Sequence, residues 1–362
     1  MPGPPDRPWL LNPGPCNTSE AVRAALQTPD TCHREADYLN VQTEVRSLLM
    51  EAFGRDPGEW TCALITGSGT AALEMAISSS VSGSGEMLVV VNGVYGDRIA
   101  TMARAHGIEA HELVSGWTER PDLEALERLL IAHEGIEVVA MVHHETTTGL
   151  LNPVVEVGAI CRRYGKRLVL DTISGLAGES LDLDDVDIAV CTANKLVQGL
   201  PGVSFCLVRR AFAADLAGYP QRSVYLDLRN YIAKQESGGT PFTPAVQVTL
   251  AMRQALRELV EETVEGRVAR MAETSTRLRE GFARLGLAVY LDASLHSNTI
   301  TTLRLPSGVD YEMLHDRMRA RGYVIYAGQG VLREEAFRIA NMGLLTREAV
   351  DGVITALEEA IR

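Results

Sequence analysis

The sequence predicts an α/β fold, with a large domain built on a mainly parallel sheet flanked by helices and a smaller C-terminal α+β domain. Two observations predict it. Short apolar runs alternate with amphipathic stretches as far as about residue 210, which is typical of strands joined by helical crossovers. Beyond residue 260 a long helical stretch leads into a different order of strands and helices. We therefore expect an N-terminal arm over residues 1–15, the large domain over residues 16–260 and the small domain over residues 261–362.

The first predicted elements are helices. Thr18 or Ser19 can cap a short helix over Glu20–Leu26, just after a Pro-Gly-Pro turn. A polar loop over residues 28–38 follows. Apolar residues then recur at helical spacing, which predicts an amphipathic helix over residues 38–53, with Val41, Val45, Leu48, Leu49 and Ala52 on its apolar side.

The next stretch predicts a strand, a glycine-rich turn and a helix. The strand ends at Ile65, and Gly67, Ser68, Gly69 and Thr70 lead into an Ala-rich helix. Backbone N–H groups and the helix dipole converge on an anion in such a turn, although the same pattern also occurs as an ordinary glycine turn. The alternation then continues, with strands predicted within residues 87–93, 138–142, 167–171, 188–192 and 204–210, and helices within residues 97–106 and 121–133.

The C-terminal part has its own pattern. Residues 261–287 predict one long helix whose apolar stripe contains Val264, Val268, Met271, Thr274, Leu278 and Phe282. Strands are predicted in NTITTLRL, YVIY and FRIAN, and helices in YEMLHDRMRARG and over Thr346–Ile361. This order is typical of a small α+β unit.

Composition excludes several classes of partner. The 362 residues carry 34 basic and 47 acidic side chains, a net charge of −13, which argues against nucleic acid or an anionic membrane as the main partner. Any anionic ligand must therefore meet a local cation. The six cysteines form no CxxC pair and no apolar run is long enough to span a membrane, so we expect a reduced, cytoplasmic protein without a metal site.

Four features follow the ends of predicted parallel strands, where ligands bind in open α/β sheets. They are an anion-binding helix start at Ser68–Thr70, an aromatic ring at Tyr95, a carboxylate at Asp171 and an amine at Lys195. Together they match a cofactor that has a phosphate, a flat ring, a basic ring nitrogen and a carbonyl. The sequence thus predicts pyridoxal 5'-phosphate.

The chemistry of this cofactor requires these residue types. Lys195 would condense with the aldehyde and, once displaced by substrate, move the proton, while Asp171 would keep the ring nitrogen protonated. Tyr95 would stack on the ring. Each residue also has a simpler reading: Lys195 as a surface lysine, Asp171 as a helix cap and Tyr95 as the edge of the core.

Successive motifs resemble those of the class V aminotransferases of fold type I. They are LLNPGPCNTS, DTCHREADY, GSGTAALE, NGVYGDR, HHETTTGLLNP, LVLDTISG, TANKLVQGLPG, TPFTPAVQ and FRIANMG. Within that family the motifs are most similar to the 2-aminoethylphosphonate–pyruvate transaminases, with alanine–glyoxylate transaminases as wider relatives. The resemblance implies a homodimer with a shared active site, which converts 2-aminoethylphosphonate and pyruvate to phosphonoacetaldehyde and L-alanine.

The resemblance also implies residue roles. Lys195 and Asp171 are the catalytic residues, and Tyr95 is the stacking ring. The phosphate is implied to be held by Ser68, Gly69 and Thr70, and by Thr243 of the partner subunit, while Thr146 lies near the ring hydroxyl. Arg338 is implied to hold the anionic group of the substrate, with Arg34 as a second cation or, alternatively, in a loop salt bridge. Arg338 itself could instead be a surface arginine on a C-terminal strand.

Three positions depart from the family pattern. Asn12 opens a turn that usually reads TPGP, Gln329 stands where phosphonate transaminases lead us to expect a lysine, and Ala340 replaces a glycine. Gln329 weakens the substrate assignment and leaves the cofactor assignment intact. Another small amino acid or a modified aminophosphonate therefore remains open as the substrate of an aminotransferase or lyase.

Three other functions use parts of the same sequence pattern. A cysteine desulfurase resembles this pattern but carries histidines where Asn194 and Tyr95 stand here. A metal-dependent hydrolase or binding protein would use His143, His144 and Glu145 with Cys32 and His33, although adjacent strand residues point to opposite faces. A catalytically inactive homologue is the third alternative, and the intact Lys195 and Asp171 argue against it.

Overall fold

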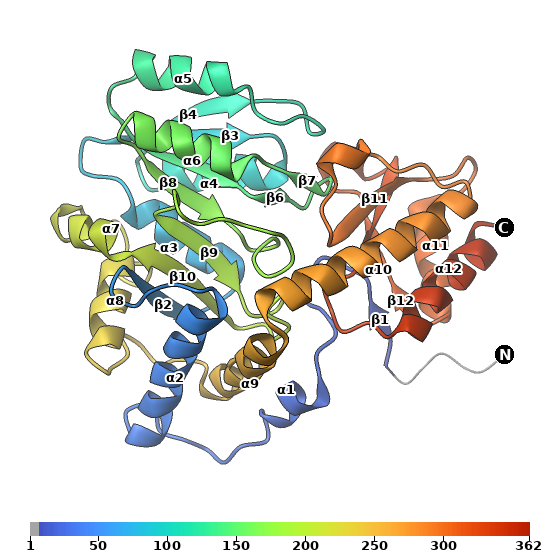
Figure 1. Cartoon of the computed structure of the whole chain (residues 1–362), viewed down its shortest axis with the longest axis horizontal. Coiled ribbons are helices and arrows are strands. Elements are labelled where there is room, and N and C mark those ends of the chain that lie inside the picture. Colours follow the sequence, from blue (N-terminus) through green and yellow to red (C-terminus); the bar gives the residue numbers. More distant parts are fainter. Residues whose placement is uncertain (1–6) are drawn as a thin grey trace.

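The computed structural model describes residues 7–362, and its centre is a seven-stranded sheet. The strand order is β2-β10-β9-β8-β5-β3-β4 (Figure 1). These strands are β2 (Trp60–Thr66), β3 (Glu86–Val91), β4 (Glu109–Val114), β5 (Ile136–Val142), β8 (Arg167–Asp171), β9 (Ile188–Thr192) and β10 (Val203–Arg209). Only β10 runs against its neighbours, so the predicted mainly parallel sheet is confirmed.

Helices cover both faces of this sheet, because its strands are almost entirely apolar on both sides. One face packs under α2 (Ala36–Ala52), α5 (Leu123–Ala132), α6 (Val154–Arg163) and α9 (Val246–Glu262). The other packs under α3 (Gly69–Ser79), α4 (Val94–Ala105), α7 (Arg210–Asp215) and α8 (Leu228–Glu236). The short helix α1 (Glu20–Ala24) contacts α9 and is capped by Ser19, whose hydroxyl accepts a hydrogen bond from the Val22 N–H at 3.0 Å.

The C-terminal part has a core of its own. A three-stranded sheet in the order β11-β14-β13 packs with α10, α11 and α12 (Figure 1). The bounds are α10 (Val264–Arg284), β11 (Ile300–Arg304), α11 (Tyr311–Ala320), β13 (Tyr326–Ala327), β14 (Ala336–Ala340) and α12 (Arg347–Ile361). Short pieces complete the chain: β6 (His144–Glu145) pairs with β7 (Leu150–Leu151), and 3-10 turns span Leu216–Gly218, Ala293–Leu295 and Gly330–Leu332.

The N-terminal segment lies against this C-terminal part. Strand β1 (Trp9–Leu10) pairs in parallel with β12 (Tyr323–Val324). The Leu11 N–H donates to the Val324 carbonyl at 2.8 Å, and Leu11 is buried in the C-terminal core. Part of the expected arm, residues 1–6, lies outside the described residues; the part from Trp9 onward is held by the C-terminal unit.

Several elements differ from the sequence prediction. Helices α8 and α9 form between residues 211 and 262, where the alternating pattern ends and a loop-rich region was predicted. The long helix expected from residue 261 is interrupted at Thr263 (φ 65°), whose side chain caps α10 by accepting a hydrogen bond from the Gly266 N–H. The YVIY run is split between β12 and β13, which belong to different sheets. Strand β4 was not predicted, because its sequence EAHELV is polar and lies at the half-exposed edge of the sheet. Over residues 7–362 no helix combines the length and apolar character that crossing a membrane requires.

Candidate active site

The loops that carry the predicted site residues leave one edge of the large sheet. Strands β2, β3, β5, β8 and β9 run in the same direction, so their carboxyl ends meet at that edge. Ser68 follows β2, Tyr95 follows β3, Thr146 follows β5, Asp171 ends β8 and Lys195 follows β9. The parallel order of the sheet therefore brings together residues up to about 130 positions apart in the sequence.

Lys195 lies in a tight turn whose backbone is fixed. The Gln198 N–H donates to the Lys195 carbonyl at 2.8 Å, and the Cys16 thiol donates to the same oxygen at 3.2 Å. The Pro-Gly-Pro turn lies over the side chain. Gly14 has φ +98°, and a Cβ added there would stand 2.9 Å from the Lys195 Cγ. Glycine at position 14 thus leaves room for the lysine.

The Lys195 amine is free to react. Its Nζ lies 6.0 Å from the centre of the Tyr95 ring and makes no hydrogen bond or ion pair with any residue of 7–362. Burial lowers the pKa of this amine, and the nearby Tyr95 and Asp171 oppose that shift. A lowered pKa increases the neutral fraction, which is the nucleophilic and proton-accepting form.

Asp171 is buried at the end of β8, where it is 3% exposed. One carboxylate oxygen accepts the Ile173 N–H at 2.9 Å. Burial raises the pKa of Asp171, while this hydrogen bond and the positive charges of Lys195 and Arg98 oppose the rise. A cationic ring nitrogen beside Asp171 would favour its ionised form.

The predicted phosphate end is the start of α3. Ser68 precedes the helix with an extended backbone and makes no side-chain cap. The Ala71 N–H donates to the Ser68 carbonyl at 2.9 Å, whereas the N–H groups of Gly69 and Thr70 have no hydrogen-bond partner in residues 7–362. Nearby, the Arg98 guanidinium donates to the Thr70 hydroxyl at 3.5 Å and its Cζ lies 4.6 Å from the centre of the Tyr95 ring. The sequence analysis missed Arg98. Its spacing of three residues from Tyr95 on α4 was the available signal, since such residues share a helix face.

Arg338 is a buried cation on β14, only 5% exposed, and not a surface residue. Its Nε donates to the Ala327 carbonyl at 3.0 Å, and its Nη1 donates to the Thr146 carbonyl at 2.7 Å and to the Gln329 Oε1 at 3.2 Å. Its Nη2 has no hydrogen-bond partner in the described chain. Arg338 thus joins the C-terminal unit to the loop of Thr146, with donors left for a ligand.

Glu145, directly before Thr146, is completely buried. Its carboxylate accepts the Thr147 hydroxyl at 2.6 Å and the Gly96 N–H at 3.3 Å. Burial raises its pKa to about 7, against these hydrogen bonds. Its carboxylate packs on Gly93, where an added Cβ would stand 2.4 Å from the Glu145 side chain. Glu145 therefore fixes the start of α4, the helix that carries Tyr95, and sequence reasoning gave it no such role.

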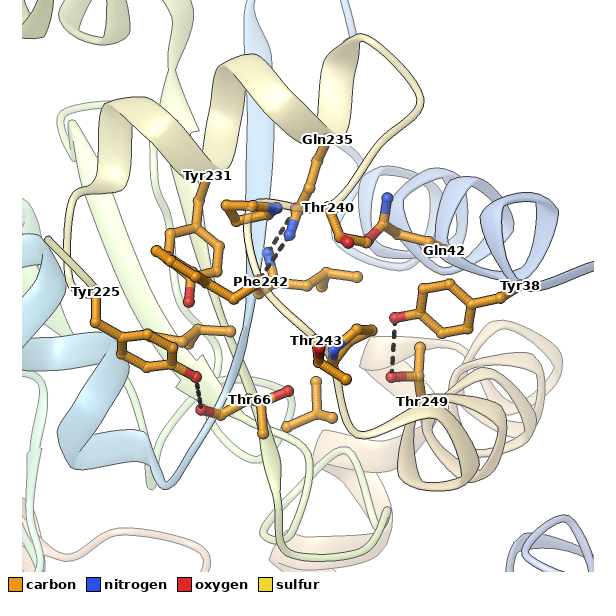
Figure 2. A pocket seen from close by; sticks show the side chains of 15 residues that line it. Tyr38, Gln42, Thr66, Tyr225, Tyr231, Gln235, Thr240, Phe242, Thr243 and Thr249 are labelled. Carbon is orange, nitrogen blue, oxygen red and sulfur yellow. Dashed lines mark hydrogen bonds between the residues drawn. The ribbon is translucent and has the colours of Figure 1, made fainter. Parts of the chain in front are cut away.

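Two predicted residues lie apart from this group. Thr243 is exposed and lines a cavity with Tyr38, Thr66 and Tyr225 (Figure 2), and no hydrogen bond joins it to Ser68–Thr70 or Lys195 within residues 7–362. Thr243 and Arg34 both line a neighbouring surface hollow of about 730 Å³. Arg34 makes no ion pair with any described residue, so the alternative of a loop salt bridge is not supported by the structure.

The alternative metal cluster does not assemble. His143 and His144 are buried, and Cys32 is exposed in the polar turn before α2. The His144 Nδ1 bonds to the Ser174 carbonyl at 2.9 Å, and burial lowers the pKa of His143 to about 4 and that of His144 to about 3. These rings are neutral parts of the loop beside Asp171.

A family model described as aminotransferase class-V matches residues 43–347. The chain belongs to the class V aminotransferases. It is 38% identical to the 2-aminoethylphosphonate–pyruvate transaminase of Aeromonas hydrophila, over 97% of this chain and 94% of that protein. It is also 38% identical to the enzyme of the same name from Klebsiella pneumoniae, over 97% and 96%. Alanine–glyoxylate aminotransferase from Nostoc sp. has the same fold, with a TM-score of 0.92 and 28% identity over 100% of this chain and 97% of that one.

Membership makes the protein an aminotransferase that depends on pyridoxal 5'-phosphate. The side chains at the sheet edge fit this cofactor. An unpartnered amine at Lys195, a buried carboxylate at Asp171 and an aromatic ring at Tyr95 match its aldehyde, ring nitrogen and ring face. The uncapped helix start at Ser68, with the Arg98 guanidinium beside it, matches its phosphate.

Proposed function

We propose that this aminotransferase transfers the amino group of 2-aminoethylphosphonate to pyruvate, giving phosphonoacetaldehyde and L-alanine. The observation that carries the proposal is Arg338, a buried guanidinium with an unpartnered Nη2 in the loop cluster of Tyr95 and Thr146. Amino donor and keto-acid acceptor each carry one anionic group near the reacting carbon: the phosphonate is one methylene away from it in the donor, and the carboxylate is bonded to it in pyruvate. A fixed, planar cation can hold a phosphonate in one half-reaction and a carboxylate in the other.

Each residue at the sheet edge has a separate role in the reaction. The cofactor supplies an electron sink for the carbon that exchanges its proton. Lys195 holds the cofactor covalently at rest and, when free, moves a proton between two carbons, for which a lowered amine pKa is required. Asp171 holds the ring nitrogen in its protonated form, and Tyr95 fixes the plane of the ring. The Thr146 hydroxyl would lie near the ring hydroxyl.

The phosphate site would combine Ser68, Gly69 and Thr70 with Arg98. The Arg98 guanidinium touches the Thr70 hydroxyl and lies over the Tyr95 ring, so it would stand between the phosphate and the stacked ring. Arg98→Gln should weaken binding of pyridoxal 5'-phosphate to the apoenzyme by about tenfold or more, because a charged hydrogen bond contributes about 1.5–3 kcal/mol. It should leave binding of pyridoxal, which lacks the phosphate, unchanged. Equal losses for the two compounds would remove Arg98 from the phosphate site.

The contact between Gln329 and Arg338 favours a second candidate. The Gln329 amide oxygen accepts from Arg338, so this position adds a neutral group where a lysine would add a second cation. One guanidinium suits a singly charged group better than a doubly charged phosphonate. The alternative is therefore transamination of a small amino acid, of the alanine–glyoxylate type, or of a modified aminophosphonate.

We also propose a homodimer in which Thr243, and with it Arg34, serves the active site of the neighbouring subunit. Both residues are exposed and line the same surface hollow, away from Lys195 of their own chain, which supports this arrangement. All six cysteines are free, which supports a reducing, cytoplasmic location. The separate C-terminal core and the helix break at Thr263 support a division into residues 16–260 and 261–362.

The deciding experiment is an absorbance spectrum of the loaded enzyme mixed, without keto acid, with 2-aminoethylphosphonate or with alanine. Loss of the visible band of the lysine-bound cofactor with both compounds is expected. If alanine alone removes the band, the substrate proposal is wrong, the second candidate takes its place, and Gln329→Lys becomes the next variant to assay. If neither compound removes it, both candidates fail.

A further inference from the structure

Outside the active site, Glu86, His111 and His133 gather at the opposite end of the sheet. Their side-chain ligand atoms all lie within 4.8 Å of one another. In the described part of the chain they are the only group of three or more His, Cys, Asp or Glu side chains arranged in this way. We propose that they form a binding site for a divalent transition-metal ion of the zinc type.

The three residues come from three rigid elements. Glu86 is the first residue of β3, His111 is the third residue of the edge strand β4, and His133 directly follows α5. All three side chains lie on the α5 face of the sheet. Leu88 and Val90 of β3, Leu113 of β4, and Leu126 and Leu130 of α5 share one apolar core there.

Backbone hydrogen bonds hold each position. The Glu86 N–H donates to the Gly135 carbonyl at 2.8 Å, and the Ile136 N–H donates to the His133 carbonyl at 3.1 Å. The Glu86 carboxylate packs directly on Gly135, where an added Cβ would stand 2.7 Å from its Oε1. Thus the turn that carries His133 also confines the carboxylate, which favours one fixed arrangement of the ligands.

The side-chain geometry suits an ion. The His111 Nε2 lies 2.7 Å from the Glu86 Oε2, and the rings of His111 and His133 are 4.0 Å apart between centres. Ligand atoms about 2.1 Å from a tetrahedral zinc ion lie about 3.4 Å apart. That spacing falls between the 2.7 Å contact and the 4.8 Å limit of the group, so small rotations of half-exposed side chains suffice.

The donor set identifies the class of ion. Two imidazoles and one carboxylate are the three protein ligands of several zinc sites whose fourth position is taken by water, whereas magnesium and calcium prefer oxygen alone. All three side chains are half-buried, which leaves one side open to water as a further ligand. Without an ion, two imidazole rings tilted by 35° to each other lie beside one carboxylate, and His133 has no hydrogen-bond partner for its ring in residues 7–362.

The ion would act on the structure and not on the reaction. Glu86 begins β3 and Tyr95 follows its far end, so the strand alone separates the two sites by about 17 Å at about 3.3 Å per residue. Strand β4 is the last strand of the sheet and pairs only with β3. A shared ion would clamp this edge strand to β3 and to the end of α5.

The test is calorimetric titration of the pyridoxal-phosphate-loaded enzyme with Zn²⁺, in a Cys32→Ser background because that thiol is exposed. About one ion per chain is expected, with a rise in the unfolding temperature. His133→Asn should weaken binding by at least about tenfold, since even groups that only support a metal ligand contribute about 10–100-fold. This variant keeps the Glu86–His111 pair, so a loss cannot be assigned to a broken ion pair.

His106→Asn is the matched control. His106 forms a similar pair with Glu74 at 2.9 Å, without a third ligand beside it in residues 7–362. Unchanged zinc binding in His106→Asn, together with the loss in His133→Asn, would support the site. Equal affinity in both variants, or no zinc binding to the starting enzyme, would overturn it.

Discussion

The buried group around Lys195 and the exposed surface of Thr243 and Arg34 differ in almost every physical respect. In the first, Asp171 is fixed by a hydrogen bond, and burial shifts the pKa values of Lys195 and Asp171. In the second, both residues are exposed, and Arg34 has no ion-pair partner among the described residues. Sequence motifs alone place both in one active site.

The difference teaches how a single chain can hold only part of a site. Groups whose pKa is shifted must be shielded from water, and one chain by itself buries Asp171 and half-buries Lys195. Groups that hold the outer parts of cofactor and substrate can remain on the surface if a second subunit covers them. The predictions below test this contrast.

Lys195→Ala should have the largest effect. Loss of its proton transfer alone should lower kcat by about 10²–10⁴-fold, and covalent attachment of the cofactor disappears with it. Steady-state assays and the visible spectrum measure these two losses. Lys166→Ala, at the start of β8, is the control and should be fully active. Retained transamination in Lys195→Ala would refute the assigned role.

Glu145→Gln tests the burial of the side chains around Lys195. The pKa of Glu145 is raised from 4.5 to about 7 in the folded protein, so the folded state binds its proton more tightly than the unfolded state. Stability should therefore fall as pH rises from about 4.5 to about 7, by up to about 3 kcal/mol, or about 1.4 kcal/mol per unit of pKa shift.

Urea unfolding of the apoenzyme at several pH values measures how steeply the free energy of unfolding falls with pH. Glu145→Gln cannot ionise and should flatten this pH dependence, whereas Glu124→Gln, at an exposed position on α5, should not. An unchanged slope in Glu145→Gln would show that another group titrates.

Arg338→Ala should raise the KM for the amino donor by about 10- to 100-fold, because charged hydrogen bonds contribute about 1.5–3 kcal/mol. The dissociation constant of the cofactor should change far less. Arg338→Lys should recover part of the loss, since it restores the charge but not the planar fork. An unchanged KM would remove Arg338 from the substrate site.

Thr243→Ala should weaken cofactor binding by about fivefold, the loss of one hydrogen bond of about 1 kcal/mol. A mixed dimer with Lys195→Ala makes the comparison decisive. If Thr243 serves the neighbouring subunit, one site of that dimer has both wild-type residues and binds the cofactor with normal affinity. If Thr243 serves its own chain, the only lysine-containing site stays impaired.

Arg34→Ala should have the smallest effect, about twofold in the KM for the amino donor, because an exposed cation contributes about 0.5 kcal/mol. High salt should abolish the difference between the two proteins, by screening. A change of more than tenfold would make Arg34 a principal cation for the substrate, alongside Arg338.

Most of the fold could be predicted because strands buried on both faces have continuous apolar sequences, as in β5 and β9. Strand β4 could not, since its edge position leaves it polar. The break at Thr263 depends on a backbone conformation that no periodicity records, and the neighbouring Arg267, buried at 2% exposure, stands in a predicted apolar helix.

The site residues also divide into those that could be predicted from the sequence and those that could not. Lys195, Asp171 and Tyr95 follow strands, so the topology alone brings them together. The roles of Arg98, Glu145 and the group at His111 and His133 arise from contacts between side chains of separate elements. Such contacts leave no pattern in the sequence. Glu86, His111 and His133 are 25 and 22 residues apart in the sequence, so no short spacing groups the three, and the metal-site prediction from sequence was negative.

The pairing of β1 with β12 has a consequence for how the protein is made. Trp9 and Leu10 pair with Tyr323 and Val324, which are synthesised more than 300 residues later. The turn at Gly14 that covers Lys195 is held through this strand. This segment can therefore be anchored only after β12 has been synthesised, and a nascent chain carries its lysine uncovered until then.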